Sequence, residues 1–189
     1  RSIAEKTKMK DDLRKKLKAM RRSLSAAEIA ASSEKINKRL KDVLSDKRCV
    51  MVYLSSFKEV CIDDTIRVLL GNGAIAAAPV TNEADFSITP FRLTDLNSVM
   101  HGAYGIREPL KNQRIDKRVV EAVIVPGIGF DRNGGRIGFG KGCYDRFLSD
   151  FDGLKIGVCY DFQLVDKIET DKNDIPMDMI ITESGCYVI

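Results

Sequence analysis

The chain has 189 residues, of which 44% are hydrophobic and 31% charged, a balance typical of one globular domain that buries its core without staples. No apolar run approaches the roughly 20 residues that cross a bilayer, and the basic N-terminus lacks the apolar core of a secretory signal. Residues 1–22 hold ten Lys or Arg and three acids, a net +7, so with an overall charge of +4 residues 23–189 carry −3.

Two helices are expected at the N-terminus. Leu13, Leu17, Met20 and Leu24 recur with helical spacing, which predicts one buried stripe. The sequence from Ser25 to Glu28 forms a capping box, so a second helix should begin there and run to about residue 44. Residues 1–8 are either disordered or upstream of a natural start at Met9.

Apolar runs then alternate with helical segments. Strands are predicted over 49–55, 74–80, 86–91, 121–125, 154–160 and 179–183, with helices over 63–70, capped by Asp63, and 142–151. The polar stretch 105–118 is read as a surface excursion. This order predicts a single α/β domain over 1–189, a three-layer αβα sandwich with a mainly parallel sheet, in which ligands lie beyond the carboxyl ends of the strands.

The cysteine and histidine residues limit which metal sites, catalytic groups and cellular compartment we expect. Cys49, Cys61, Cys143, Cys159 and Cys186 form no CxxC pair and are expected to be mostly buried free thiols in a reducing, cytoplasmic compartment. The single histidine, His101, argues against a His-rich zinc site or a His-based triad. Any metal should therefore be a hard cation held by carboxylates and phosphates.

The stretch 126–148 is the main functional signal. It holds seven glycines within the sixteen residues 127–142, between a buried strand and a helix. Without side chains, a backbone can approach a ligand closely and direct successive N–H groups at one anion. The pattern predicts a phosphate-binding loop, centred on 134–142, whose ligand is ATP.

Part of this loop follows the spacing of a P-loop. Gly135 to Lys141 matches G-x4-G-K, but Gly142 stands where Ser or Thr would bind Mg²⁺. Asp145, one turn into the helix, could supply the missing ligand to phosphate-bound Mg²⁺. Lys141 and Arg136 would neutralise phosphate charge and are the candidate catalytic residues.

This loop is similar to the signature of the 5-formyltetrahydrofolate cyclo-ligase family, also called 5,10-methenyltetrahydrofolate synthetases. The pattern that it shares with the signature is P-G-x-G-F-D-x-x-G-x-R-[LI]-G-x-G-K-G-x-Y-D. Four other segments resemble the family as well: 10–14, 53–60, 104–109 and 174–183 with the nearby Gln163. The resemblance spans about residues 10–183. It implies a fold similar to that of sugar-phosphate isomerases and CoA transferases, decorated with N-terminal helices.

The resemblance also implies a reaction and a set of site residues. ATP, with Mg²⁺, would phosphorylate the formyl oxygen of 5-formyltetrahydrofolate, and N10 would close the ring with release of ADP and phosphate. Asp145 would hold the metal. The residues implied for ATP are Lys10, Arg14, Arg136, Ile137, Gly138, Phe139, Gly140, Lys141, Gly142, Cys143 and Tyr144. Those implied for the folate are Leu54, Glu59, Tyr104, Gly140, Lys141, Gly142 and Cys143.

Two positions depart from the family pattern. Phe139 stands where relatives can have Arg, and Cys143 replaces the first Tyr of the usual G-Y-Y-D, which removes a charged contact and a phenol. The alternatives are an enzyme of the same architecture acting on a sugar phosphate or acyl-CoA, and a nucleic-acid binder using the basic helix 6–22. No aromatic residue interleaves those positive charges.

The expected partners are therefore small molecules. The substrate is a folate whose polyglutamate tail, where present, the basic helix would attract. Neither nucleic acid nor membrane is expected as a partner, and the chain should be a monomer or a weak homodimer.

Overall fold

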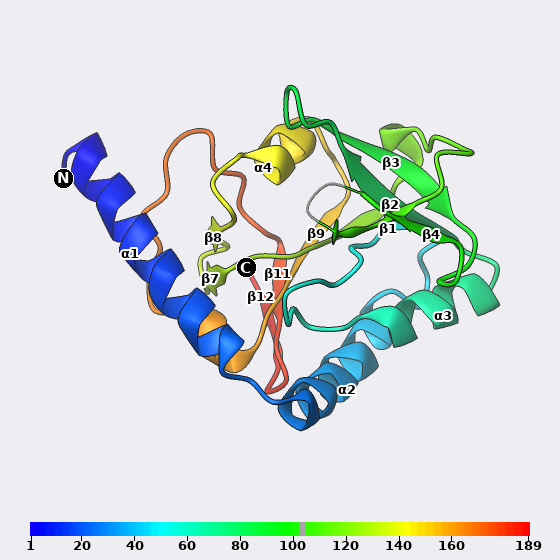
Figure 1. Cartoon of the computed structure of the whole chain (residues 1–189), viewed down its shortest axis with the longest axis horizontal. Coiled ribbons are helices and arrows are strands. Elements are labelled where there is room, and N and C mark those ends of the chain that lie inside the picture. Colours follow the sequence, from blue (N-terminus) through cyan, green and yellow to red (C-terminus); the bar gives the residue numbers. More distant parts are fainter. Residues whose placement is uncertain (103–104) are drawn as a thin grey trace.

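A seven-stranded sheet forms the centre of the molecule (Figure 1). The structure is a computed structural model that describes residues 1–102 and 105–189. The five inner strands run parallel, and each edge strand is antiparallel to its neighbour. In spatial order the strands are β12 (Cys186–Val188), β11 (Met179–Ile181), β9 (Leu154–Val158), β6 (Ala122–Val125), β1 (Cys49–Met51), β2 (Ile75–Thr81) and β3 (Ile88–Leu93). The mainly parallel α/β architecture is confirmed.

Both faces of the sheet are covered, which explains why its strands are apolar throughout. Along β6, Ile124 packs into one core and Val123 and Val125 into the other, since successive side chains point to opposite faces. The first core includes side chains of α2 (Ala26–Val43) and α3 (Asp63–Gly71), and the second those of α4 (Cys143–Leu148). The helices therefore form the two outer layers of the predicted sandwich.

Two small sheets were not predicted. One joins β7 (Gly129–Asp131), β8 (Arg136–Ile137) and β10 (Leu164–Val165), and the other joins β4 (Val99–His101) and β5 (Arg107–Pro109). The hairpin β7–β8 lies inside the glycine-rich stretch, so the open loop before α4 is only 138–142. The excursion 105–118 contains β5 and leads into a short 3-10 helix, η2 (Lys117–Val119), while a second one, η3 (Asp161–Gln163), precedes β10.

Helix α1 (Ile3–Arg22) docks beside this hairpin rather than on the central sheet (Figure 1). Its side chain Leu17 packs in a small core with Ile128, Ile137 and Ile168. A Cβ on Gly129 would lie 2.7 Å from Leu17 Cδ1, so a larger residue there would displace the leucine side chain from its present position. Ser2 caps the helix, and residues 3–8 are therefore helical rather than disordered.

The buried face of α1 differs from the predicted stripe. Leu17 is 1% exposed, but Met20 is 39% exposed and Arg21 is buried in its place. The prediction for Met20 is wrong because apolar spacing finds a stripe that faces a large core, whereas α1 contacts a narrow hairpin through the buried Leu17 and the partly buried Leu13. Polar side chains fill the rest of the inner face.

Smaller differences concern element ends and caps. The capping box of Ser25 is confirmed for α2. Asp63 is the first residue of α3 and does not cap it; its carboxylate instead pairs with Arg107 at 3.2 Å. The strand predicted over 49–55 ends at residue 51, and the helix predicted over 142–151 ends at residue 148. All five cysteines are free, but only Cys49 and Cys159 are buried.

None of the helices in the described part of the chain is both long and apolar enough to cross a membrane.

The docking of α1 predicts a large effect for Leu17→Ala. Removing a fully buried leucine side chain should lower the free energy of unfolding by about 2–5 kcal/mol, because a cavity replaces its contacts. Urea unfolding followed by circular dichroism measures this change. Met20→Ala on the same helix is the control and should stay within about 0.5 kcal/mol of the parent. Equal losses in the two variants would contradict this account of the docking.

Candidate active site

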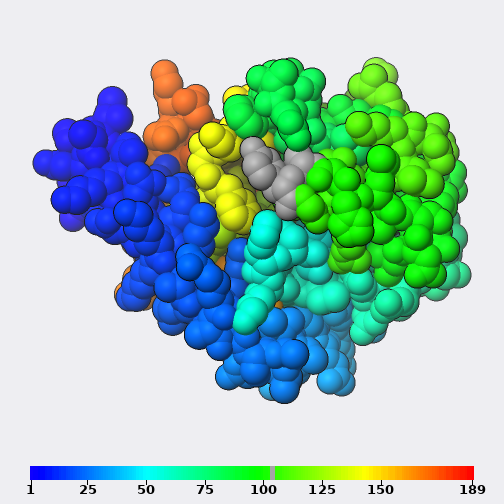
Figure 2. All heavy atoms as spheres, viewed as in Figure 1, coloured from blue at the N-terminus to red at the C-terminus, as the bar shows by residue number. Residues whose placement is uncertain are grey.

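The candidate site lies beyond the carboxyl ends of the parallel strands, where α/β sheets bind ligands. The glycine loop, residues 138–142, leaves β8 and enters α4 at this end of the sheet. On the face shown in Figure 2, the glycine loop (yellow) lies between α1 (blue), the segment 55–60 (cyan) and the turn between β2 and β3 (green). These are the segments that carry most of the predicted site residues.

The glycine loop presents its backbone to solvent. Gly140 and Gly142 have φ values of +95° and +67°, a conformation that glycine adopts without strain. The amide groups of residues 139–142 donate no hydrogen bond to any residue within 1–102 or 105–189. Unpaired amides on such a loop favour an anion. Because α4 is only six residues long, we assign this property to the loop rather than to a helix dipole.

Helix α1 brings cations to the glycine loop. Arg14 Nε donates a hydrogen bond of 2.8 Å to the carbonyl of Gly138, and Lys18 Nζ lies 5.1 Å from the ring centre of Phe139. Lys10 Nζ lies 2.6 Å from a carboxylate oxygen of Asp174. Of the predicted pair, Arg14 therefore meets the glycine loop, 124 residues later in the chain, whereas Lys10 contacts the loop that carries Asp174.

Arg136 is turned inward. Its side chain is 8% exposed, donates to the carbonyl of Pro126 at 3.0 Å and lies 3.7 Å from the carboxylate of Asp145. Burial lowers the pKa of the guanidinium, and Asp145 opposes this shift by favouring the charged form. Arg136 Nε is buried without a hydrogen-bond partner in the described residues, so the guanidinium retains one donor for a further group.

Two carboxylates lie on the same side of the glycine loop. Asp145 accepts a hydrogen bond of 3.1 Å from the backbone of Ile175, the neighbour of Asp174, and both carboxylates act on the charge of Arg136. Within the described residues, no three His, Cys, Asp or Glu side chains form a metal cage. One or two carboxylates do suit Mg²⁺ that also binds phosphate and water.

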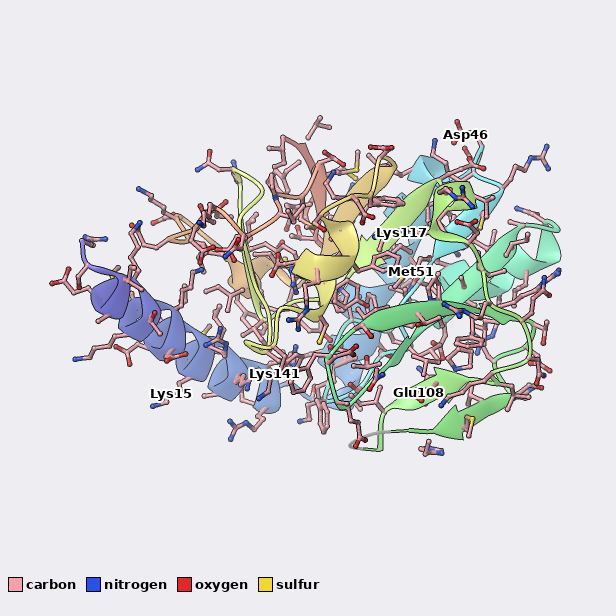
Figure 3. The ribbon with its side chains drawn as sticks, turned by 90° about the horizontal axis from the view of Figure 1, so that it is seen from above. Lys15, Asp46, Met51, Glu108, Lys117 and Lys141 are labelled. Carbon is pink, nitrogen blue, oxygen red and sulfur yellow. The ribbon has the colours of Figure 1, made fainter. Side chains whose placement is uncertain are left out.

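Lys141 is exposed at the tip of the glycine loop. Its ammonium lies 5.1 Å from the ring centre of Phe86, which belongs to the turn between β2 and β3. Arg146 donates a 2.5 Å hydrogen bond to the carbonyl of Lys141, so α4 holds the backbone at this position. Figure 3 places Lys141 at the same end of the molecule as Lys15 of α1.

Two phenol side chains hold the segment 55–60, which carries Glu59. Tyr53 and Tyr160 donate hydrogen bonds of 2.7 and 2.8 Å to the carbonyls of Val60 and Lys58. Lys58 Nζ in turn donates to two carbonyls at the end of α1, each at 2.7 Å. Phe57 and Lys58, which precede Glu59, both have positive φ values, so the segment bends sharply at this point.

Glu59 lies in a mixed electrostatic setting. Burial raises the pKa of its carboxyl, while hydrogen bonds from Ser56 and the charge of the buried Arg21 oppose that rise. Tyr144 of α4 is close enough that the Glu59 charge, added to burial, raises the pKa of its phenol. Glu59 therefore links the 55–60 segment electrostatically to α4, the helix that follows the glycine loop.

Several predicted side chains do not face this opening. Leu54 and Ile137 are buried in apolar cores, and Cys143 and Tyr144 are partly buried. Phe139 is half-exposed at the glycine loop. Tyr104 lies outside the described residues.

Four residues near the site were not predicted to belong to it: Asp174, Arg21, Lys58 and Phe86. Asp174 stands in a polar run with Asp171, a composition that signals a loop but no partner. The other three act through contacts with segments far away in sequence, which no local pattern encodes.

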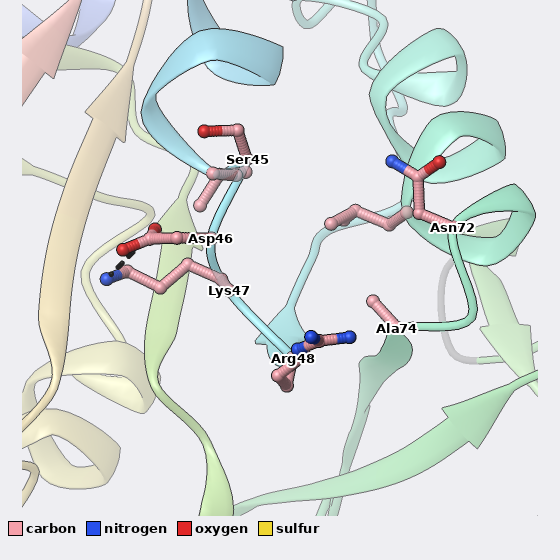
Figure 4. Close-up of a pocket in the computed structure, with 8 residues that line it drawn as sticks. Ser45, Asp46, Lys47, Arg48, Asn72 and Ala74 are labelled. Atoms are coloured by element: carbon pink, nitrogen blue, oxygen red, sulfur yellow. Dashed lines mark ion pairs between the residues drawn. The ribbon is translucent and has the colours of Figure 1, made fainter.

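Cavity size does not identify the candidate site in this molecule. The larger one, about 470 Å³, lies at the amino ends of β1 and β2, the opposite end of the sheet, and is lined by Ser45, Arg48 and Asn72 among others (Figure 4). A smaller one of about 310 Å³ is lined by Arg136, Asp174 and Ile175 and adjoins the charged cluster of the site. We assign the site from the side chains and not from cavity size.

Known proteins share this arrangement of segments. A model of the 5-formyltetrahydrofolate cyclo-ligase family matches residues 6–183. The chain is similar to the 5-formyltetrahydrofolate cyclo-ligase of Mycoplasma pneumoniae, with 26% identity over 92% of this chain and 98% of the relative. The structure is similar to that of 5,10-methenyltetrahydrofolate synthetase from Aquifex aeolicus (34% identity, TM-score 0.84, 95% and 92% of the two chains). The Mycoplasma pneumoniae synthetase structure is also similar (27%, TM-score 0.76, 92% and 98%).

The environment of Glu59 predicts a pH-dependent stability change in Glu59→Gln. Because the folded pKa is raised, an ionised Glu59 opposes folding, and the substitution should increase the free energy of unfolding at pH 7. The gain should shrink as pH falls through the folded pKa and vanish below about 4.3, where both states bind the proton.

Urea unfolding from pH 4 to pH 8 measures this difference. Glu34→Gln, an exposed acid on α2, is the matched control and should show no such trend. A gain for Glu59→Gln that grew on acidification would contradict the assigned environment.

Proposed function

The chain belongs to the 5-formyltetrahydrofolate cyclo-ligase family, and on that premise we propose that it converts 5-formyltetrahydrofolate to 5,10-methenyltetrahydrofolate with ATP and Mg²⁺. One observation carries the proposal. A cationic and amide-rich phosphate side, formed by α1 and the glycine loop, meets Glu59 across Tyr144. Two ligands of different chemistry can therefore lie in contact, as a group transfer between them requires.

The proposed reaction needs activation of a formyl group. The formyl oxygen attacks the γ-phosphorus of ATP, the bond to ADP breaks, and an iminium phosphate forms. N10 then bonds to the formyl carbon, loses its proton, and phosphate leaves with the former formyl oxygen. Phosphorylation is useful because amide oxygen is a poor leaving group and phosphate a good one. The protein's part is positioning and charge neutralisation.

On the phosphate side, the free amides of residues 139–142 would bind the ATP phosphates. Arg14 reaches the same loop and Lys10 lies at the neighbouring Asp174, and both would supply charge. Lys141, which forms no ion pair with any described residue, can follow the γ-phosphoryl group during transfer because it is a point charge on a flexible stem. The buried Arg136 would donate a hydrogen bond from its Nε, which has no partner among the described residues.

Asp145, assisted by Asp174, would hold Mg²⁺. The metal, when bound to ATP, would neutralise phosphate charge that the lysines and arginines leave uncompensated. Asp145 already lies against Arg136 and Asp174 against Lys10, so their charges are balanced before any ligand enters.

On the folate side, Glu59 would accept hydrogen bonds from the N–H groups of the pterin ring. Hydrogen bonds from Ser56 hold its carboxylate, and Arg21 favours the ionised form that accepts best. Cys143 and Phe139 replace bulkier or charged groups of relatives, and we expect them to affect folate affinity more than ATP affinity.

A coupled assay tests the proposal. Purified protein is supplied with 5-formyltetrahydrofolate, MgATP and buffer, and methenyl-folate absorbance is followed beside ADP release. Equal molar amounts of both products are expected. Absence of methenyl product at high enzyme concentration, with the protein shown to be folded, would refute the function.

Lys141→Ala should lower kcat about 100-fold, as expected when one preorganised cation is removed from a transferring phosphoryl group. Its effect on the folate KM should be small, because the 55–60 segment is untouched. The same assay, with each substrate varied in turn, measures both constants. Lys15→Ala removes an exposed lysine from α1 and should behave as the parent. A loss confined to the folate KM would contradict the assigned role.

Asp145→Asn should raise the Mg²⁺ concentration needed for half-maximal rate by at least about tenfold, because the variant lacks a ligand charge. Titration of Mg²⁺ into chelator-treated protein measures this value. Asp152→Asn, an exposed acid beyond α4, serves as the control. An unchanged Mg²⁺ requirement for Asp145→Asn would remove this residue from the metal site.

A further inference from the structure

Phe86 adopts a backbone conformation that is unusual for a bulky residue. It ends the turn between β2 and β3 with φ of +59°, and its amide donates to the carbonyl of Asn82 at 2.8 Å. Glycine or asparagine normally occupies such a left-handed position, because a Cβ crowds the neighbouring carbonyl. A strained bulky residue is retained only where its side chain contributes something in return.

Burial does not offset the backbone strain at Phe86, since its side chain is only partly buried. Its ring instead faces the glycine loop, with the Lys141 ammonium 5.1 Å from its centre, within the range of a cation–π contact. Helix α4, which carries Arg146, also contacts β3, the strand that follows this turn. Arg146 also bonds the Lys141 carbonyl, so backbone and side chain of Lys141 are held separately.

We propose that Phe86 is a positioning residue for Lys141, holding its ammonium at the mouth of the phosphate side of the site; this rests on the proposed function. The choice of an aromatic ring has a physical reason. A carboxylate in this place would neutralise Lys141 and compete with the phosphates, whereas the face of a ring holds a cation and leaves its full charge available. The β2–β3 turn thereby becomes part of the ATP site.

The first experiment measures ATP affinity by calorimetry for the parent, Phe86→Leu and Phe86→Tyr. Leucine fills similar space without a π face and should weaken ATP binding about 2- to 5-fold, the range of an exposed cation–π contact. Tyrosine keeps the ring and should restore parental affinity. In a Lys141→Met background, Phe86→Leu should have no further effect, because the cation on which it acts is gone.

The second experiment uses the free protein and is independent of catalysis. Protons of the Lys141 side chain next to an aromatic face should show an upfield NMR shift in the parent and in Phe86→Tyr, and lose it in Phe86→Leu. Absence of that shift in the parent would overturn the inference, as would an undiminished effect of Phe86→Leu in the Lys141→Met background. Failure of the proposed function alone appears differently: no methenyl product, with the Lys141 shift present.

Discussion

The contact between Leu17 and Gly129 supports the whole phosphate side of the candidate site. Helix α1 is strongly basic, and on its own it would be a solvated helix with no reason to lie near the glycine loop. One buried leucine against a glycine places it across the hairpin β7–β8. Lys10 and Arg14, two turns and one turn earlier on the same face, then reach Asp174 and the carbonyl of Gly138 respectively. Hydrophobic burial of one side chain thus fixes the position of several charges.

Most of the charges so assembled are balanced in pairs, whereas burial and the neighbouring charges of Arg14, Arg21 and Arg22 lower the pKa of Lys18. Arg136 faces Asp145, Lys10 faces Asp174, and Glu59 lies near Arg21. Such preorganisation lowers the cost of bringing a polyanion and a metal into one place, because little has to move when they bind. Lys141 and Lys18 are exceptions among the described residues, since an aromatic ring rather than an acid faces each of them.

Local signals in the sequence predicted much of this architecture and missed its long-range contacts. The capping box at Ser25 and the apolar strand before Pro126 depend on neighbours in the chain, and both predictions are confirmed. Periodicity selected Met20 for the core because it counts apolar residues, and it could not show that α1 docks over a narrow hairpin beside the buried Arg21. The turn at Phe86 contains no glycine, so its left-handed residue gave no signal. The high glycine content around 127–142 likewise concealed a hairpin, in which Gly135 is needed because a Cβ there would lie 2.8 Å from the Asp131 carboxylate.

The distance in sequence between α1 and its partners has a consequence for biosynthesis. Helix α1 leaves the ribosome before the segments on which it docks: the partner of Arg14 follows 124 residues later and that of Lys10 164 residues later. At roughly 5–20 residues per second, the helix waits about 8–30 s for the segments on which it docks. Its capping box and its charged surface suit that interval, although Ile3, Met9 and Met20 are exposed on the helix as well. A helix that is made before its partners is therefore among the last parts of this domain to find its place.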